Sequence, residues 1–148
     1  MWKVSDYLST LGAVSGTAKK LSDLGFTEAQ TCGAVAMGLN VKIRSDGDGI
    51  SGTITEGITG YCQLSAGKAG GLLLTVPAGT TKITLGAKNT NKALAICDTD
   101  GTTVLKAFDD VADSNYSDHV YEHTFTEETK VYINSPSGTT NFKAIKIE

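Results

Sequence analysis

The chain has 148 residues, of which 40% are apolar and 20% charged, and its 13 Lys and Arg against 16 Asp and Glu give a net charge of -3. This length suits one domain over residues 1–148, with a core that needs neither a metal nor disulfides. The acidic balance argues against nucleic acid as a partner, because nucleic-acid-binding proteins owe much of their affinity to neutralised phosphates. We therefore expect a single, mildly acidic globular domain.

The first residues lack the basic start and apolar stretch of a secretory signal peptide. No apolar run approaches the ~20 residues that a spanning helix needs, so we expect no membrane insertion. These features fit a cytosolic protein, a trimmed part of an exported one, or a protein released by lysis. The odd number and wide spacing of the cysteines, Cys32, Cys62 and Cys97, predict small buried side chains, with one disulfide and one free thiol as the alternative.

The first half of the chain, residues 1–71, is predicted to be rich in loops because it holds 13 of the 17 glycines. Residues 17–24 allow one short N-terminal helix, since positions 18, 21 and 24 are apolar and Gly25 follows as a C-terminal cap. The glycine-rich region offers three strands, at residues 2–5, 34–44 and 60–65.

The second half, residues 72–148, has a regular pattern of short strands rich in Thr, Val and Ile. Turn residues separate these strands, as at 77–80, 98–101 and 135–138. The expected strands are residues 72–76, 82–88, 92–98, 103–108, 119–126, 130–134 and 142–147. Such spacing without helical periodicity predicts an all-β fold, an antiparallel, jelly-roll-like β-sandwich.

No catalytic motif is found, and we expect a protein that is not an enzyme. Residues 47–52 match the G-x-G-x-x-G string of dinucleotide-binding loops, but residues 53–55 are β-forming where that motif needs a helix, and Asp48 would repel phosphates. A glycine-rich loop is the better interpretation. No Gly-x-Ser-x-Gly elbow or recognisable Cys-His pair is present, whereas paired carboxylates cannot be judged from sequence.

Nine of the 16 acidic residues fall between Asp98 and Glu128, opposed only by Lys106. A solvated acidic loop is the favoured interpretation. The alternative is a structural calcium ion, the one cofactor considered, bound by Asp109, Asp110, Asp113 or Asp118. His119 and His123 share one face of an expected strand about 13 Å apart, which is too far to bind one ion, so we expect two exposed histidines.

The aromatic and basic side chains divide between core and surface. We expect Trp2, Phe125, Tyr132 and Phe142 to pack inside the domain. The candidate ligand-binding residues are Tyr61, Tyr116 and Tyr121, placed near loops or open faces, and Lys82, Lys88 and Lys92, grouped around one hairpin. An exposed tyrosine can stack on a sugar ring while lysines bind its carboxylates. Lysines that protect strand edges from aggregation would look the same.

Residues 70–148 resemble the β-sandwich modules appended to pectate lyases and other secreted gut-bacterial polysaccharide-degrading proteins. The resemblance rests on the order of the strands and of the turn residues between them. It also rests on the similarity of the opening residues 2–6 to the family's first strand. The matching segments are residues 72–77, 82–88, 92–94, 98–101, 131–133, 135–138 and 142–147. About half the chain is covered, and residues 10–68 do not follow the family.

The resemblance implies a noncatalytic, carbohydrate-binding-module-like domain that recognises a polysaccharide or cell-surface glycan, with Lys92 as a sugar contact. The lack of an export signal favours an alternative, a phage virion protein such as a capsid or tail decoration subunit, whose partners are copies of itself or other virion proteins. Both hypotheses place the protein outside the cell or on a virion surface. They can coincide, since virion sandwiches can bind glycans.

Overall fold

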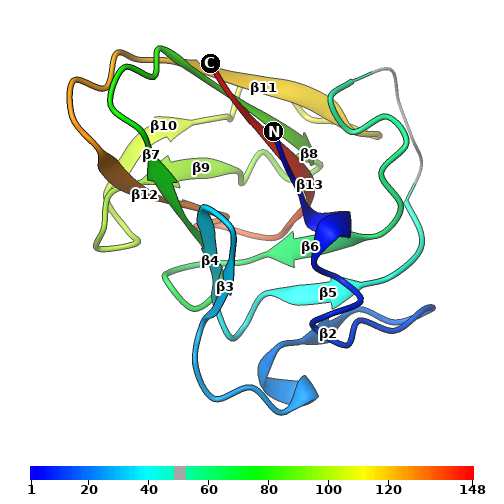
Figure 1. Cartoon of the computed structure of the whole chain (residues 1–148). Coiled ribbons are helices and arrows are strands. Elements are labelled where there is room, and N and C mark those ends of the chain that lie inside the picture. Colours follow the sequence, from blue (N-terminus) through cyan, green and yellow to red (C-terminus); the bar gives the residue numbers. More distant parts are fainter. Residues whose placement is uncertain (49–52) are drawn as a thin grey trace.

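The computed structural model describes residues 1–48 and 53–148, which form two antiparallel β-sheets packed face to face (Figure 1). Sheet A contains β1 (Trp2–Lys3), β2 (Lys19–Lys20), β5 (Lys42–Arg44), β6 (Tyr61–Leu64), β8 (Lys82–Lys88), β11 (Ser117–Glu122) and β13 (Thr140–Ile147). Sheet B contains β3 (Gln30–Cys32), β4 (Val35–Met37), β7 (Leu72–Val76), β9 (Ala95–Cys97), β10 (Val104–Ala107) and β12 (Thr129–Asn134). The expected all-β sandwich is confirmed.

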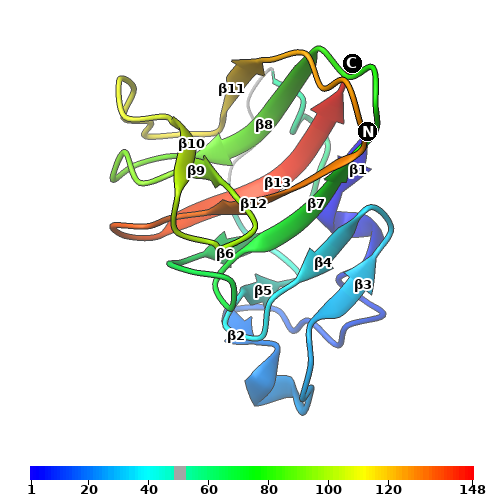
Figure 2. The same cartoon turned by 90° about the vertical axis from the view of Figure 1, so that its left-hand side faces the viewer.

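From β7 onward the chain passes back and forth between the sheets. Sheet A has the strand order β11-β8-β13-β6-β5-β2, with β1 also paired to β13, and sheet B has the order β10-β9-β12-β7-β4-β3. Strands that are adjacent in a sheet are therefore mostly distant in sequence, as the interleaved colours in Figure 2 show. One side of the sandwich ends in β10 and β11, and the other ends in β2 and β3.

Alternating apolar residues place the core between the sheets. Leu72, Leu74 and Val76 on β7 are fully buried, as are Ile83 and Leu85 on β8. The predicted bounds of residues 72–76 and 82–88 are confirmed without change. Gly101 closes the predicted hairpin turn with a φ of 76° and donates its N–H to the Asp98 carbonyl at 2.9 Å.

The prediction of one strand over residues 34–44 is wrong. This segment forms β4 in sheet B and β5 in sheet A, joined by a crossing at Gly38. The Gly38 N–H donates to the Gly71 carbonyl at 3.0 Å, and a Cβ on Gly38 would lie 2.4 Å from the Ala69 carbonyl oxygen. A glycine is thus needed where the chain changes sheets.

The helix considered for residues 17–24 is replaced by the short strand β2 and one 3-10 turn, η2 (Ser22–Leu24). Leu21 is fully buried, and the N–H groups of Leu21 and Ser22 donate to the carbonyls of Val41 and Leu39. Tertiary hydrogen bonds therefore replace those of a helix. Gly25 does cap the turn, in the left-handed conformation with φ 98°.

Other strands are shorter than predicted. The strand expected over residues 92–98 is reduced to β9, because Lys92 has a φ of 53° and the Asn89 side chain accepts the N–H groups of Ala93 and Leu94. The strand expected over residues 119–126 runs instead over β11, so His123 lies beyond it. A further 3-10 turn, η1 (Val4–Asp6), ends the strand expected over residues 2–5 early. Residues 53–55, which were expected to favour a β-strand, form a turn.

The cysteines are free and buried, as expected. Trp2, Phe125 and Phe142 pack in the core, but Tyr132 is only half-buried, which corrects its assignment. His119 is 5% exposed, so the expectation of two exposed strand histidines is also wrong.

Among residues 1–48 and 53–148 no helix is long and apolar enough to cross a membrane.

The crossing at Gly38 can be tested by Gly38→Ala. The new methyl group would meet backbone carbonyls that cannot move without disturbing β4 and β7, so we expect a loss of about 1–3 kcal/mol in the free energy of unfolding by urea. Gly138→Ala is the matched control, because its Cβ would meet nothing closer than the Ala93 Cβ at 3.3 Å. Equal stability of the two variants would contradict this account of the crossing.

Candidate functional site

Part of the outer face of sheet A, above Gly86 of β8, is covered by residues 53–58 of the same chain. Thr55 is fully buried, and its methyl group lies above Gly86 of β8, where a Cβ would approach it to 2.4 Å. The Ile54 N–H donates to the Asp118 carboxylate on β11 at 3.1 Å. These contacts hold residues 54 and 55 against β8 and β11, so this part of the face is not open to a large ligand.

Asp48 is the centre of the polar contacts beneath this covering segment. Its carboxylate accepts hydrogen bonds from the Tyr116 hydroxyl at 2.7 Å, the Asn141 amide at 2.8 Å and the Lys88 ammonium at 3.1 Å. We call these four residues together with Lys143 the Asp48 cluster. The cluster draws on β8, β13 and two loops, which are far apart in sequence.

Lys143 supplies a second ammonium group to the cluster and is fully buried. It lies at the irregularity between Phe142 and Ala144, where the register of β13 with β8 shifts. Its Nζ donates to the Ile58 carbonyl at 2.8 Å and lies 3.5 Å from the Asp48 carbonyl oxygen and 4.7 Å from the centre of the Tyr116 ring. Carbonyl oxygens and an aromatic face thus solvate this cation in place of water.

The cluster is arranged to keep Asp48 ionised. Burial raises the pKa of Asp48, but hydrogen bonds from Tyr116, Lys88 and Asn141 together outweigh it and hold that pKa below its ordinary value. Burial, then the bond to Asp48, raises the pKa of Tyr116, and burial lowers the pKa of Lys143. No buried side-chain N or O in the described part of the chain lacks a partner. A ligand could bind here only by breaking these bonds.

The six predicted ligand-binding residues do not share one exposed surface. Lys88 and Tyr116 meet in the Asp48 cluster, where Tyr116 is 2% exposed. Tyr61 is also buried, contrary to its predicted position at an open face. Lys82 is 3.9 Å from the Glu148 carboxylate, Lys92 is exposed in the turn before β9, and Tyr121 stacks on His123 with ring centres 5.5 Å apart.

The four aspartates considered as calcium ligands lie in different surroundings. Asp113 contacts the Nε2 of buried His119 at 2.8 Å, Asp118 accepts the Ile54 N–H, and Asp109 and Asp110 are exposed. Within residues 1–48 and 53–148, no three His, Cys, Asp or Glu side chains converge as a metal ion would need. The acidic stretch therefore gives no assembled cation site in this part of the chain.

His119 also lies 3.3 Å from the Ser117 hydroxyl, so a serine, a histidine and an aspartate meet at this point. In a hydrolytic triad the serine and the aspartate bond to opposite nitrogens of the ring. Here both approach Nε2, which also faces the Ala87 carbonyl at 3.3 Å. The arrangement joins β11 to β8 and the 109–116 loop, but His119 cannot take a proton from Ser117 at one ring nitrogen while Asp113 orients it through the other.

The outer face of sheet B, in contrast, is open. Tyr132 pairs with Leu73, Leu73 with Ala36, and Ala36 with Thr31, so four side chains form a row across β12, β7, β4 and β3. In the next row Lys130 pairs with Thr75. We call these six residues the sheet-B face. Thr31 and Lys130 are exposed and the other four are half-buried, which leaves an aromatic and aliphatic strip with polar margins.

Shallow hollows flank this strip. One of about 180 Å³ is lined by five of the six residues of the sheet-B face, all except Tyr132. Another of about 210 Å³ lies beside Tyr132 and is bordered by Leu39 and Lys68. Tyr132 thus borders an apolar hollow, and the neighbouring hollow adds the polar groups of Thr31, Thr75 and Lys130 to an apolar floor.

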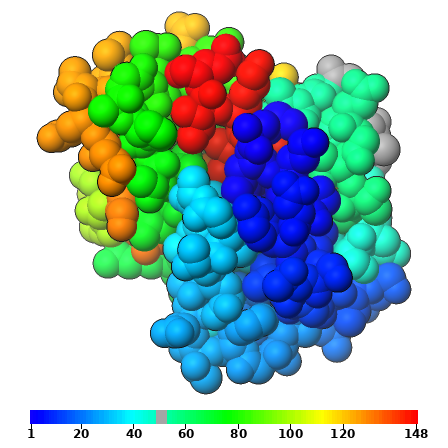
Figure 3. Space-filling model, viewed as in Figure 1, coloured from blue at the N-terminus to red at the C-terminus, as the bar shows by residue number. Residues whose placement is uncertain are grey.

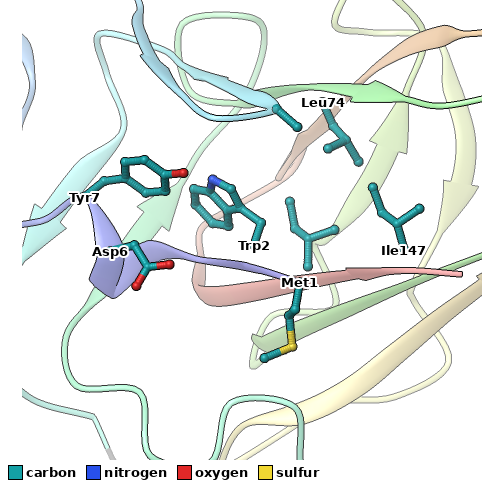
Figure 4. Close-up of a pocket in the computed structure, with 8 residues that line it drawn as sticks. Met1, Trp2, Asp6, Tyr7, Leu74 and Ile147 are labelled. Carbon is teal, nitrogen blue, oxygen red and sulfur yellow. The ribbon is translucent and has the colours of Figure 1, made fainter.

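A third hollow, of about 280 Å³, lies at the edge of the sandwich (Figure 4). Trp2 and Tyr7 stack there with ring centres 5.9 Å apart, and Leu74 and Ile147 face Trp2 from the two sheets. Trp2 donates its Nε1–H to the Cys32 carbonyl at 2.8 Å. In Figure 3 the N-terminal residues fill the space between the β3–β4 region and the C-terminal strand. Ala34 borders both this hollow and the sheet-B face.

No protein-family model matches this chain, and no curated protein matches it in sequence.

Sequence reasoning missed the sheet-B face, although a signal was present. Tyr132 lies between Val131 and Ile133, which are fully buried, and the two-residue period of a strand therefore directs Tyr132 outward. The matching outward positions, Leu73 on β7 and Ala36 on β4, become its neighbours only through the register of strands that are distant in sequence. The aromatic residue type favours a core position, whereas the alternation along β12 directs Tyr132 to the open face.

The role of Asp48 can be tested by Asp48→Asn. Because the folded-state pKa of Asp48 lies below its unfolded value, its stabilising effect is present above pH 4 or so and is lost as pH falls through the folded pKa. We expect the variant to be about 1–3 kcal/mol less stable at pH 7. We also expect its urea unfolding free energy to fall less than that of the wild type between pH 6 and pH 3.

Asp109→Asn, at an exposed position outside the cluster, is the control and should follow the wild-type pH profile. An Asp48→Asn profile parallel to that of the wild type would show that the Asp48 cluster does not hold an ionised carboxylate.

Proposed function

We propose that this protein is a noncatalytic binding domain that recognises an extended polysaccharide on the sheet-B face. The observation that carries the proposal is the row Tyr132–Leu73–Ala36–Thr31, brought into register across four strands on the open side of the sandwich. Neighbouring strands are about 4.8 Å apart, so this row spans about 15 Å, a length suited to a short stretch of sugar chain.

The side chains of this face suit sugar chemistry. A tyrosine ring offers an apolar surface for the C–H face of a sugar, and aliphatic neighbours extend that surface. The hydroxyls of Thr31 and Thr75 can exchange hydrogen bonds with sugar hydroxyls. Lys130 and Lys68 are exposed at the margins, where an ammonium group can bind a uronic-acid carboxylate. The resemblance of residues 70–148 to modules of pectate lyases supports the same ligand class, an acidic polysaccharide.

A second candidate function, a structural subunit of an assembly such as a phage virion, is favoured by a different observation. Of the large apolar side chains found exposed in the described residues, all but Met1 lie at or near the lateral edges of the sandwich. Exposed apolar side chains at unpaired strand edges are typical of surfaces that another chain covers. These edges are distinct from the sheet-B face, so the two functions are compatible.

The glycan proposal is tested by titrating polygalacturonate into the protein by calorimetry. We expect binding by the wild type, a loss of about tenfold or more in affinity for Tyr132→Ala, and near-normal affinity for Tyr132→Phe, because phenylalanine keeps the stacking ring. Circular dichroism would confirm that each variant is folded.

A matched pair of lysines tests the location of the site. Lys130→Ala should weaken binding severalfold, whereas Lys82→Ala, on sheet A, should not change it. Binding that is insensitive to Tyr132 and Lys130, or no binding to any polymer on a glycan array, would overturn the proposal.

A further inference from the structure

The two ends of sheet A carry opposite charges. At one end lies β11, whose neighbour in the sheet is β8, and at the other lies β2, whose neighbour is β5. Figures 1 and 2 show these two strands on opposite sides of the molecule. Among the described residues, neither strand has a second partner strand, so each leaves backbone N–H and C=O groups available for pairing.

The β11 end is acidic and apolar. Asp118 and Glu122 on β11 are exposed, and Val120 between them is 40% exposed. On the same side of the sandwich, β10 exposes Val104 and Leu105 at 47% and 44%. The exposed acids Asp98, Asp109, Asp110, Glu127 and Glu128 come from the loops around these strands. This end therefore fits a strand that carries lysines and apolar residues.

The β2 end has the complementary character. β2 consists of Lys19 and Lys20, and Lys20 pairs with Lys42 of β5, which places three lysines at this end of the sheet. Val14, in the segment that leads to β2, is 40% exposed. Asp46 lies nearby, but its carboxylate is bound by Arg44 at 2.7 Å and by the Gly16 N–H at 2.9 Å. Asp23, in the turn after β2, is exposed, but the three lysines outnumber it, with Lys19 exposed and Lys20 and Lys42 half-buried. The surface at β2 therefore has a net positive charge.

Pairing of β11 with another β11 is disfavoured by its own sequence. In an antiparallel self-pair centred on Val120, Asp118 of each strand faces Glu122 of the other. Like charges directly opposite each other destabilise a strand pair. A symmetric dimer through this edge would thus place four carboxylates together, whereas β2 would place lysines beside them.

We propose that copies of this protein associate head to tail, with the β11 end of sheet A in one copy against the β2 end in the next. Such a contact joins two different surfaces, so it propagates into a ring or a filament rather than closing as a dimer. The continuous sheet would cover Val120 and pair the exposed acids with lysines. This inference is independent of glycan binding, because the sheet-B face stays open.

The test uses the full chain in sedimentation velocity over a range of concentrations at low salt. We expect the wild type to form species larger than a dimer, and their dissociation constant to rise about tenfold or more on adding 0.5 M NaCl, because the contact is electrostatic. Glu122→Lys alone and Lys19→Glu alone should each remain monomeric under conditions where the wild type associates.

The decisive experiment is a mixture of the two single variants. Each variant carries the charge that the other has lost, so the mixture and the double variant Glu122→Lys/Lys19→Glu should associate again. The control Lys130→Ala, on the sheet-B face, should assemble like the wild type. Failed glycan binding with intact assembly would overturn only the glycan proposal, and the reverse result would overturn only this one.

Three results would overturn head-to-tail association. A wild type that stays monomeric at all concentrations would show that the lysines of β2 only prevent the exposed edge of sheet A from pairing with other chains. Stronger association of Glu122→Lys than of the wild type would indicate a symmetric β11–β11 pair instead. Monomers that bind a lysine-rich peptide, and lose it on Glu122→Lys, would assign the β11 edge to a different protein.

Discussion

The buried ammonium group of Lys143 is the constraint on which the arrangement of this molecule depends. A cation without water is costly unless other groups solvate it. Here the Ile58 carbonyl, the Tyr116 ring and the Asp48 backbone approach it, and the Asp48 carboxylate adds a nearby negative charge. All three come from loops outside β13, so Lys143 is solvated only when those loops are closed over sheet A.

This closure gives the two faces of the sandwich different properties. Sheet A is covered by the segment that contains Thr55 and Ile58, and its polar groups are used internally. Within residues 1–48 and 53–148, no segment covers Tyr132, Leu73 and their neighbours on sheet B, and this open surface is where we propose that a glycan binds. The edges, with opposite charges at β11 and β2, form a third kind of surface, through which we propose that copies of the chain associate.

The parts of the fold that were predictable are those that depend on local alternation. The strands at residues 72–76 and 82–88 are predictable because every second side chain is apolar and turn residues follow. Residues 34–44 are not, because β4 and β5 are distinguished only by a change of sheet at Gly38. For the site, residue type alone points to Lys88 and Tyr116, but both contact Asp48, which lies 40 and 68 positions away from them in the sequence.

The sequence by itself determined the β class, the free buried cysteines and the separation of charge, because composition and two-residue periodicity are local properties of the chain. Only the tertiary structure decided which face is open and which side chains share it. Tyr132, Leu73, Ala36 and Thr31 become neighbours through the register of four strands spread over about 100 residues. That register is set by packing of the buried face of each strand in the core, which brings together segments from both halves of the chain.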